Sequence, residues 1–225
     1  MIVMTWNMQG SAKSEKTTNI AEVLPLLNKG VDLLLLQEVG SCMDWKLERK
    51  TILGVKLRHG LIPVGTSMAR VYWYDSKENG AASHDRCSMA VISPHITHLD
   101  IVKHRTSGTL RPLIGARLSN GLWIYNIHAP SKGHKAASGV ADRLISERCK
   151  FAKEKYACIG DFNCPPSEME GKGYNVEAAD WETHIGGNTL DYAVYKGLTV
   201  MLMSAKALDL PVKMSDHYSQ LFKVL

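Results

Sequence analysis

Short apolar runs separated by polar segments dominate this chain, and the pattern predicts many short strands with few helices. The runs lie at residues 1–6, 31–36, 70–74, 89–93, 98–102, 113–118, 122–127, 157–160, 190–195, 199–203 and 219–224. Val31–Leu36 is uninterrupted, which is typical of a strand buried on both faces. Asn120-Gly121 separates two of the runs and is a strong hairpin signal.

Two segments have the pattern of helices. Thr17–Lys29 ends before Gly30, a residue typical of the position after a helix, and Pro25 is expected to delay or kink the helix. Gly139–Tyr156 has apolar residues on one side and basic residues on the other. We interpret the basic side as a helix surface that faces solvent. Together with the strands, this predicts an α/β fold in which helices cover two mainly antiparallel sheets.

The organisation of the chain is simple. No repeat or linker divides it, so we expect residues 1–225 to form a single domain. No apolar run is long enough to cross a membrane, and the chain opens on a strand where a signal peptide would have an apolar helix. The Gly-rich segment Cys164–Asn188 predicts a long loop at the edge of a substrate site.

Charge and cysteine content narrow the function only slightly. The chain has 27 Lys and Arg against 22 Asp and Glu, and this net charge of +5 is compatible with a polyanionic partner without requiring one. The five cysteines include no C-x-x-C pair, so a structural zinc site is not expected. Their odd number excludes a fully paired disulfide framework and leaves a single disulfide, or a bridge to a partner, open.

Polar clusters at the edges of the predicted strands are the main functional signal. The five clusters are Thr5-Trp6-Asn7, Gln37-Glu38, Ile127-His128, Gly160-Asp161-Phe162-Asn163 and Ser215-Asp216-His217. Residues at the ends of buried strands are held by a rigid scaffold and still face solvent, as catalytic residues do. Each cluster alone is an ordinary polar strand end. Together, their carboxylates, amides and histidines predict one magnesium-dependent active site.

Three of these residues are candidates for holding the metal. Mg²⁺ binds oxygen ligands, usually one or two carboxylates completed by water and substrate phosphate. Glu38 directly follows four leucines, where a carboxylate is costly to bury unless it binds something. Asp216 is expected to add a second carboxylate, and Asn7 to orient Glu38 or bind a water of the same ion.

The histidines are candidates for proton transfer. Neighbours on a strand point to opposite faces, so the partner of His217 is predicted to be Asp191 rather than the adjacent Asp216. A carboxylate on one ring nitrogen fixes the tautomer and lets the other nitrogen take a proton from water. His128 is expected across the scissile phosphate, donating to a phosphoryl oxygen or protonating the leaving group. The seven other histidines, His184 among them, are interpreted as surface or core.

The remaining candidates would bind substrate. Asp161 and Asn163, two residues apart in an extended segment, are expected to face the same way and to hold the water or the phosphate. Arg86, Arg111 and Arg117 are candidates for phosphate contacts, because a guanidinium matches phosphate bidentately. Arg111 and Arg86 rank above Arg117, and a surface salt bridge is the ordinary alternative for each.

In this order along the chain, the motifs resemble the DNase I-like endonuclease/exonuclease/phosphatase superfamily. The resemblance rests on Trp6-Asn7, Gln37-Glu38, His128, Gly160-Asp161-Phe162-Asn163, Leu190-Asp191-Tyr192 and Ser215-Asp216-His217. Within that superfamily the chain is most similar to the catalytic B subunit of cytolethal distending toxins. This second resemblance rests on Thr5–Ser11, Arg111–Gly115 and Gly187–Ala193.

The resemblance implies a four-layer α-β-β-α sandwich with the site at one edge of two mixed, mainly antiparallel sheets. It implies hydrolysis of DNA phosphodiester bonds with Mg²⁺, for which Mn²⁺ or Ca²⁺ substitutes or assists, and partner subunits that deliver a toxin. Secretion and action in a host nucleus follow if a leader has been removed, and a cytoplasmic location otherwise. The roles implied for His128, His217, Asp191, Asp161, Asn163, Glu38, Asn7, Asp216, Arg86 and Arg111 are those given above.

Two departures from the family pattern matter. Cys164 stands where the toxin subunits tend to have arginine, and Met68-Ala69-Arg70 lacks the glutamate that supports the residue matching His128. We therefore expect His128 to lack a carboxylate partner. The alternative function is a phosphoinositide or other phosphomonoester phosphatase on the same fold. A more distant alternative is an inactive binding module, which the loss of a metal carboxylate or catalytic histidine would indicate; neither loss is seen.

Overall fold

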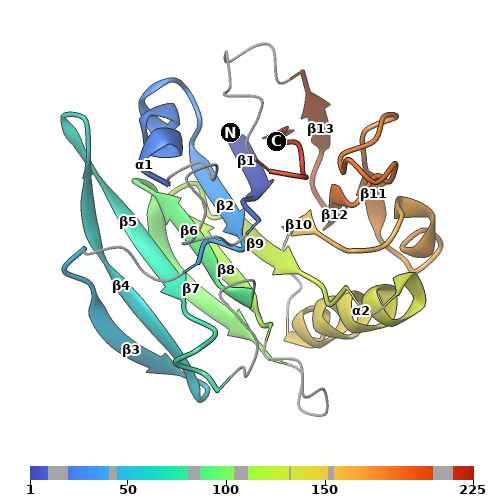
Figure 1. The fold of residues 1–225 in the computed structure, drawn as a ribbon, viewed down its shortest axis with the longest axis horizontal. Coiled ribbons are helices and arrows are strands. Elements are labelled where there is room, and N and C mark those ends of the chain that lie inside the picture. The colour runs from blue at the N-terminus through green and yellow to red at the C-terminus, as the bar shows by residue number, and fades with distance from the viewer. Residues whose placement is uncertain are drawn as a thin grey trace.

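The computed structural model describes residues 1–9, 20–40, 45–80, 87–103, 111–131, 133–151, 155–204 and 215–225. These residues form two β-sheets that pack face to face (Figure 1). One sheet has the order β13 (Val200–Met203), β14 (Gln220–Val224), β1 (Ile2–Asn7), β2 (Leu33–Gln37), β6 (Met89–Ser93), β5 (Ser67–Tyr74), β4 (Val55–Val64) and β3 (Glu48–Ile52). The other has the order β11 (Asn175–Glu177), β12 (Asp191–Lys196), β10 (Tyr156–Asp161), β9 (Trp123–His128), β8 (Leu113–Leu118) and β7 (Ile96–Val102).

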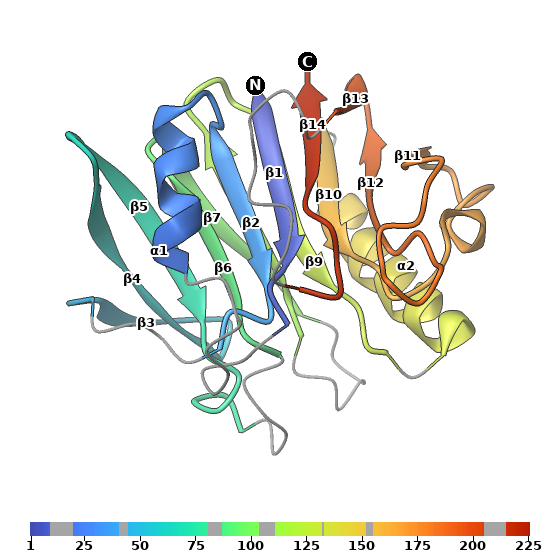
Figure 2. The same ribbon diagram turned by 45° about the horizontal axis from the view of Figure 1, so that its top comes forward.

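Helical segments cover the outer faces of both sheets. The short helix α1 (Ile20–Val23) and the 3₁₀ turn η1 (Leu24–Asn28) pack on the eight-stranded sheet, and α2 (His134–Phe151) packs on the six-stranded sheet (Figure 2). A third apolar layer lies between the sheets. The predicted four-layer α-β-β-α arrangement is therefore confirmed. Among the described residues, none of the helices is long and apolar enough to span a membrane.

Most strands lie where the apolar runs predict them, and the differences have physical causes. Pro25 interrupts the first helix as expected, because the α-helical turn ends at Val23 and a 3₁₀ turn takes over. The expected helix Gly139–Tyr156 begins earlier and ends earlier, since Gly133, at φ +93°, precedes its first turn and Tyr156 starts β10. Residues 17–19 of the first predicted helix lie outside the described part of the chain.

Three strands were not predicted. β4 carries Gly60 and Pro63, which weaken the strand signal. Pro63 is tolerated because β3 pairs only with Val55–His59, so among the described strands β5 alone pairs with residues 60–64. β3 is a charged, exposed strand, and β11 is a three-residue strand in the segment predicted to be a loop.

A buried network of amide side chains joins the two sheets directly below one of their edges. Asn126, on β9, donates its Nδ2 to the carbonyl oxygens of Leu36 at 2.9 Å and Ala90 at 3.0 Å, both in the other sheet. Its Oδ1 accepts a hydrogen bond of 2.6 Å from Nε2 of Gln37, at the end of β2. Both amide side chains are fully buried, so each bond is made without competition from water.

Loss of this network should destabilise the protein strongly. Asn126→Ala removes the donor to two buried carbonyl oxygens and one of three acceptors of the Gln37 amide. We expect this loss to lower the free energy of unfolding by about 3 kcal/mol. Urea unfolding measures this change. Asn175→Ala, at an exposed position of β11, is the matched control and should change the value by less than about 0.5 kcal/mol. Equal stability of the two variants would show that the network is not a major contributor.

Candidate active site

Strands from both sheets end together at the edge above this network. β9 and β10 run parallel with His128 opposite Asp161, and β12 brings Asp191 opposite Asp161 from the other side. In the eight-stranded sheet, β1 and β2 run parallel and end with Asn7 opposite Gln37. Asn7 Nδ2 donates to Asp161 Oδ2 at 2.9 Å and so connects the two groups. Two parallel strand pairs, and the antiparallel pairing of β10 with β12, thus gather residues distant in sequence at one edge.

Asp161 is the buried centre of this group. Its carboxylate accepts hydrogen bonds from the Asn163 backbone N–H at 2.8 Å and from the side-chain amides of Asn163 and Asn7, each at 2.9 Å. Burial, together with the charge of Asp191, raises the pKa of Asp161 to about 7, although His217 and the amide donors oppose the shift. Asn163 is not extended as expected, because its φ of +50° turns its side chain back onto Asp161.

His217 is held by the carboxylate of Asp191. The His217 Nδ1 lies 2.7 Å from Asp191 Oδ2, which also accepts a 3.0 Å hydrogen bond from the Thr183 hydroxyl. Asp191, not the adjacent Asp216, is thus the partner on this nitrogen. Burial lowers the pKa of His217, but the charge and hydrogen bond of Asp191 and the charges of Asp161 and Asp216 outweigh it and raise the pKa to about 9.

His128 has a different environment. Its Nε2 lies 3.6 Å from Asp161 Oδ2 and 3.7 Å from Glu38 Oε1. Among the described residues, none forms a hydrogen bond with the buried Nδ1, in line with the missing upstream glutamate. Burial lowers the pKa of His128 well below its ordinary value, and the positive charges of Arg111 and His217 act in the same direction.

The oxygen donors predicted to hold a metal lie on two sides of the group. Glu38, with a φ of +50°, faces His128, whereas Asp216 faces His217 at 3.9 Å between Oδ1 and Nε2. Both carboxylates reach solvent, with 13% and 35% of their side chains exposed. Partly accessible carboxylates fit a hard divalent cation. The Asn7 Oδ1 accepts a hydrogen bond of 3.0 Å from the Gln9 backbone N–H. Among the described residues, the closest sets of three ligand atoms are instead His184–Asp216–His217 and Asp161–Asp191–His217.

The three candidate arginines are placed differently. Arg111 donates from Nη1 to the carbonyl oxygen of Ala129 at 2.6 Å and from Nε to Cys87 Sγ at 3.2 Å, so its guanidinium lies beside the residue that follows His128. Arg117 stands opposite Trp123, at the far end of β9 from His128. Five residues of strand separate these ends, roughly 17 Å, so the structure does not bring Arg117 to the site. Arg86 lies outside the described residues.

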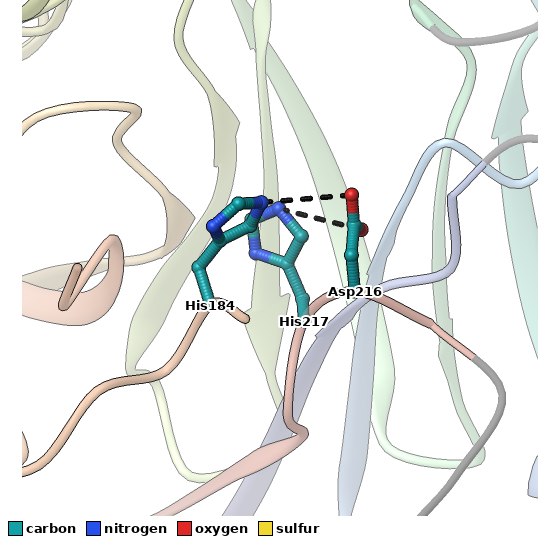
Figure 3. A group of neighbouring side chains, drawn as sticks. All are labelled: His184, Asp216 and His217. Carbon is teal, nitrogen blue, oxygen red and sulfur yellow. Dashed lines mark ion pairs between the residues drawn. The ribbon is translucent and has the colours of Figure 1, made fainter. Parts of the chain in front are cut away.

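Two residues of the site have no counterpart in the sequence interpretation. The Thr183 hydroxyl accepts the backbone N–H groups of Leu190 and Asp191 while it donates to the Asp191 carboxylate. His184, interpreted above as surface or core, lies beside Asp216 and His217 (Figure 3). The Gly186-Gly187 pair was the sequence signal for a tight turn next to Thr183 and His184, because the chain turns there and returns alongside these two residues.

Comparison with known proteins agrees with this geometry. The model of the Endonuclease/Exonuclease/phosphatase family matches residues 4–217, nearly the whole chain. The chain belongs to this family. It is accordingly a hydrolase of phosphate ester bonds, in a family that generally depends on divalent metal ions.

Toxin proteins are among the most similar relatives. A homolog of the B subunit of cytolethal distending toxin, from Salmonella typhi, is 27% identical over 240 residues, covering 98% of this chain and 88% of that protein. The cytolethal distending toxin structure of Haemophilus ducreyi matches 98% of this chain and 96% of its own, with 23% identity and a TM-score of 0.76. That of Actinobacillus actinomycetemcomitans matches 98% and 97%, with 22% identity and a TM-score of 0.73. These structures show the shared fold, and the predicted resemblance is confirmed.

The raised pKa of His217 should make stability fall with rising pH. A proton bound more tightly in the folded state stabilises it fully below pH 6.5, and this contribution is lost as the pH rises through about 9. The shift corresponds to about 3 kcal/mol of the free energy of unfolding.

Urea unfolding in EDTA, from about pH 6 to about pH 10, measures this loss. His217→Gln should remove most of the decrease above pH 6.5. The raised pKa of Asp161 acts in the same direction over a lower range, from 3.8 to about 7; the charge of His217 lowers this pKa, so His217→Gln raises it further. Parallel pH profiles of the wild type and His217→Gln would contradict the assignment.

Proposed function

We propose that this chain is a Mg²⁺-dependent DNA endonuclease that nicks DNA, of the cytolethal distending toxin B type. The observation that carries the proposal is the 2.7 Å pair of His217 and Asp191, set beside a second buried histidine, His128, and the buried carboxyl of Asp161. A carboxylate-held histidine facing a second histidine is suited to hydrolysis of a phosphodiester, where water must lose a proton while charge develops on phosphoryl oxygens.

His217 is the general base in this proposal. Its Nδ1–H donates to Asp191, so its Nε2 is the nitrogen that takes the proton of the attacking water. That nitrogen lies 3.9 Å from both Asp161 Oδ2 and Asp216 Oδ1, which leaves a water within reach of all three groups. The charged ring formed on proton transfer is stabilised by the same carboxylates that raise its pKa.

His128 is a hydrogen-bond donor in this proposal. Its lowered pKa keeps the ring neutral, which favours donation from Nε2 to a phosphoryl oxygen over protonation of the leaving group. Asp161 fixes the distance between the two histidines, since its Oδ2 lies 3.6 Å from His128 Nε2 and 3.9 Å from His217 Nε2. Asn7 and Asn163 hold that oxygen in place.

Glu38, Asn7 and Asp216 are the residues that we propose hold Mg²⁺. A divalent cation among these oxygens would supply a Lewis acid for the phosphate and would offset the negative charge that raises the pKa of His217. Mn²⁺ also prefers oxygen ligands of this kind and is expected to replace it. Arg111, whose Nη1 and Nε are already held, is proposed to direct its remaining N–H donors at a substrate phosphate. Because the Salmonella typhi relative is named as a toxin subunit, we also propose delivery subunits as partners.

Loss of either member of the His217–Asp191 pair should stop DNA nicking. His217→Ala or Asp191→Asn should slow relaxation of supercoiled plasmid in Mg²⁺ by ~10²–10⁴-fold or more, because the proton of the water has no acceptor. The control His59→Ala removes a partly exposed histidine on β4 and should nick like the wild type. Near-wild-type nicking by a folded His217→Ala protein would refute the assignment.

The same experiment distinguishes the alternative substrate. A folded wild-type chain that leaves plasmid intact in Mg²⁺ would exclude the endonuclease. Release of phosphate from phosphoinositides, lost in His217→Ala, would then identify the phosphatase that shares this apparatus. Activity on neither substrate would favour the third alternative, an inactive binding module.

Arg111→Ala should weaken DNA binding with a shallower salt dependence. Loss of one phosphate contact is expected to reduce the slope of log K against log salt concentration by ~0.9, measured on a short duplex in Ca²⁺ or with the His217→Ala protein. Arg117→Ala removes the same charge at the other end of β9 and is the matched control. An unchanged slope for Arg111→Ala would place Arg111 outside the DNA contact.

A further inference from the structure

We infer that His184 is a positioning residue of this active site, which donates a hydrogen bond to Asp216 and holds that carboxylate toward His217. This inference rests on the proposed hydrolysis, and it assigns a function to a residue that neither the motifs nor the family resemblance identifies. Three observations carry it: the tautomer of the His184 ring, the turn that fixes the ring, and the contacts that tie this turn to the segment Ser215–His217.

The tautomer follows from the backbone of the turn. The N–H of Gly186 donates to His184 Nδ1 at 2.8 Å, so Nδ1 presents its lone pair. A neutral imidazole then carries its proton on Nε2. This nitrogen lies 3.5 Å from Asp216 Oδ2 and points at it (Figure 3). The N–H of His184 is therefore on the ring nitrogen that lies nearest to the Asp216 carboxylate.

The turn is built to hold the ring in this position. A Cβ atom on Gly186 would lie 2.7 Å from His184 Nδ1, so only glycine lets its N–H come so close. Gly187 has a φ of +82°, which glycine adopts without strain. Its N–H donates to the His184 carbonyl oxygen at 3.0 Å and closes the turn. The sequence His-Ile-Gly-Gly thus fixes the side chain at residue 184 through the backbone.

The turn is also joined to the segment that carries the general base. The Ile185 N–H donates to the Asp216 carbonyl oxygen and the Tyr218 N–H to the Thr183 carbonyl oxygen, each at 2.8 Å. The rings of His184 and His217 meet edge to face, with centroids 4.7 Å apart. Asp216 itself is 35% exposed, so its carboxylate can rotate toward water unless a donor holds it. His184 is the histidine placed to do so.

The same three residues could be viewed as a metal site, but the tautomer disfavours this. A histidine that binds a metal normally donates its other ring N–H to an acceptor. At His184 the other nitrogen receives an N–H from Gly186 instead. The ring is therefore prepared to donate from Nε2 to the carboxylate rather than to bind an ion through Nε2.

Substitution of His184 and Asp216, singly and together, tests the inference. His184→Leu should lower kcat for DNA cleavage about 10-fold with little change in KM, because the carboxylate beside the base is no longer held. His184→Gln keeps an N–H donor of similar reach and should recover most of that loss. In an Asp216→Ala background, His184→Leu should cost nothing more. Additive losses, or equal losses for Leu and Gln, would overturn the inference.

A measurement independent of activity completes the test. Long-range ¹H–¹⁵N spectra of the imidazoles, assigned with His184→Gln, should show His184 with its proton on Nε2, and a proton on Nδ1 would overturn the inference. Thermal unfolding of each variant, beside the exposed control His98→Leu, excludes loss of fold as the cause. If the wild type cleaves no DNA, the proposed function fails first; the tautomer still tests the placement of His184.

Discussion

The relative position of the two sheets is the constraint on which the site depends. Asn126 and Gln37 fasten β9 to β2 through buried amide hydrogen bonds. His128 lies two residues beyond Asn126, and Glu38 follows Gln37 directly, so the two sides of the site begin within two residues of this bridge. A shift of one sheet relative to the other would leave these buried amide groups without partners. The hydrogen bonds of these side-chain amides therefore fix the position of one sheet relative to the other, which apolar packing alone would not do.

A second constraint is the surplus of buried negative charge at this edge. Asp161 and Asp191 are both buried, and they stand opposite each other on paired strands. The protein keeps Asp161 in place with neutral amide donors, which satisfy the oxygens without cancelling the charge. Burial and the charge of Asp191 raise the pKa of Asp161, and the charges of Asp191, Asp161 and Asp216 raise that of His217 against the effect of burial. A site of this kind attracts positive charge and stabilises any cation formed on His217.

The sequence predicted much of the fold and most of this site, since the strand ends and the alternation of side chains are local properties. Alternation disfavoured Asp216, Asp191 was chosen as the partner of His217, and the structure places these two side chains 2.7 Å apart. Arg117, a candidate for a phosphate contact, precedes the Asn120-Gly121 hairpin, and the structure places it beside Trp123, at the end of β9 far from His128. His184 could not be found in this way, because its neighbours are 32 and 33 residues later and are brought to it by an isolated β-bridge between His184 and His217.

The two histidines show how one site sets two different roles. Both rings are buried, and burial by itself lowers the pKa of each. His217 has a carboxylate on Nδ1 and a second beside Nε2, whereas His128 has no described partner on Nδ1 and faces the positive charges of Arg111 and His217. Their pKa values therefore move in opposite directions, which is the condition for one ring to accept a proton while the other stays neutral and donates a hydrogen bond. Among the described residues no carboxylate is bonded to His128 Nδ1, which is consistent with this role, because a carboxylate there would raise the pKa of His128 and make the two rings alike.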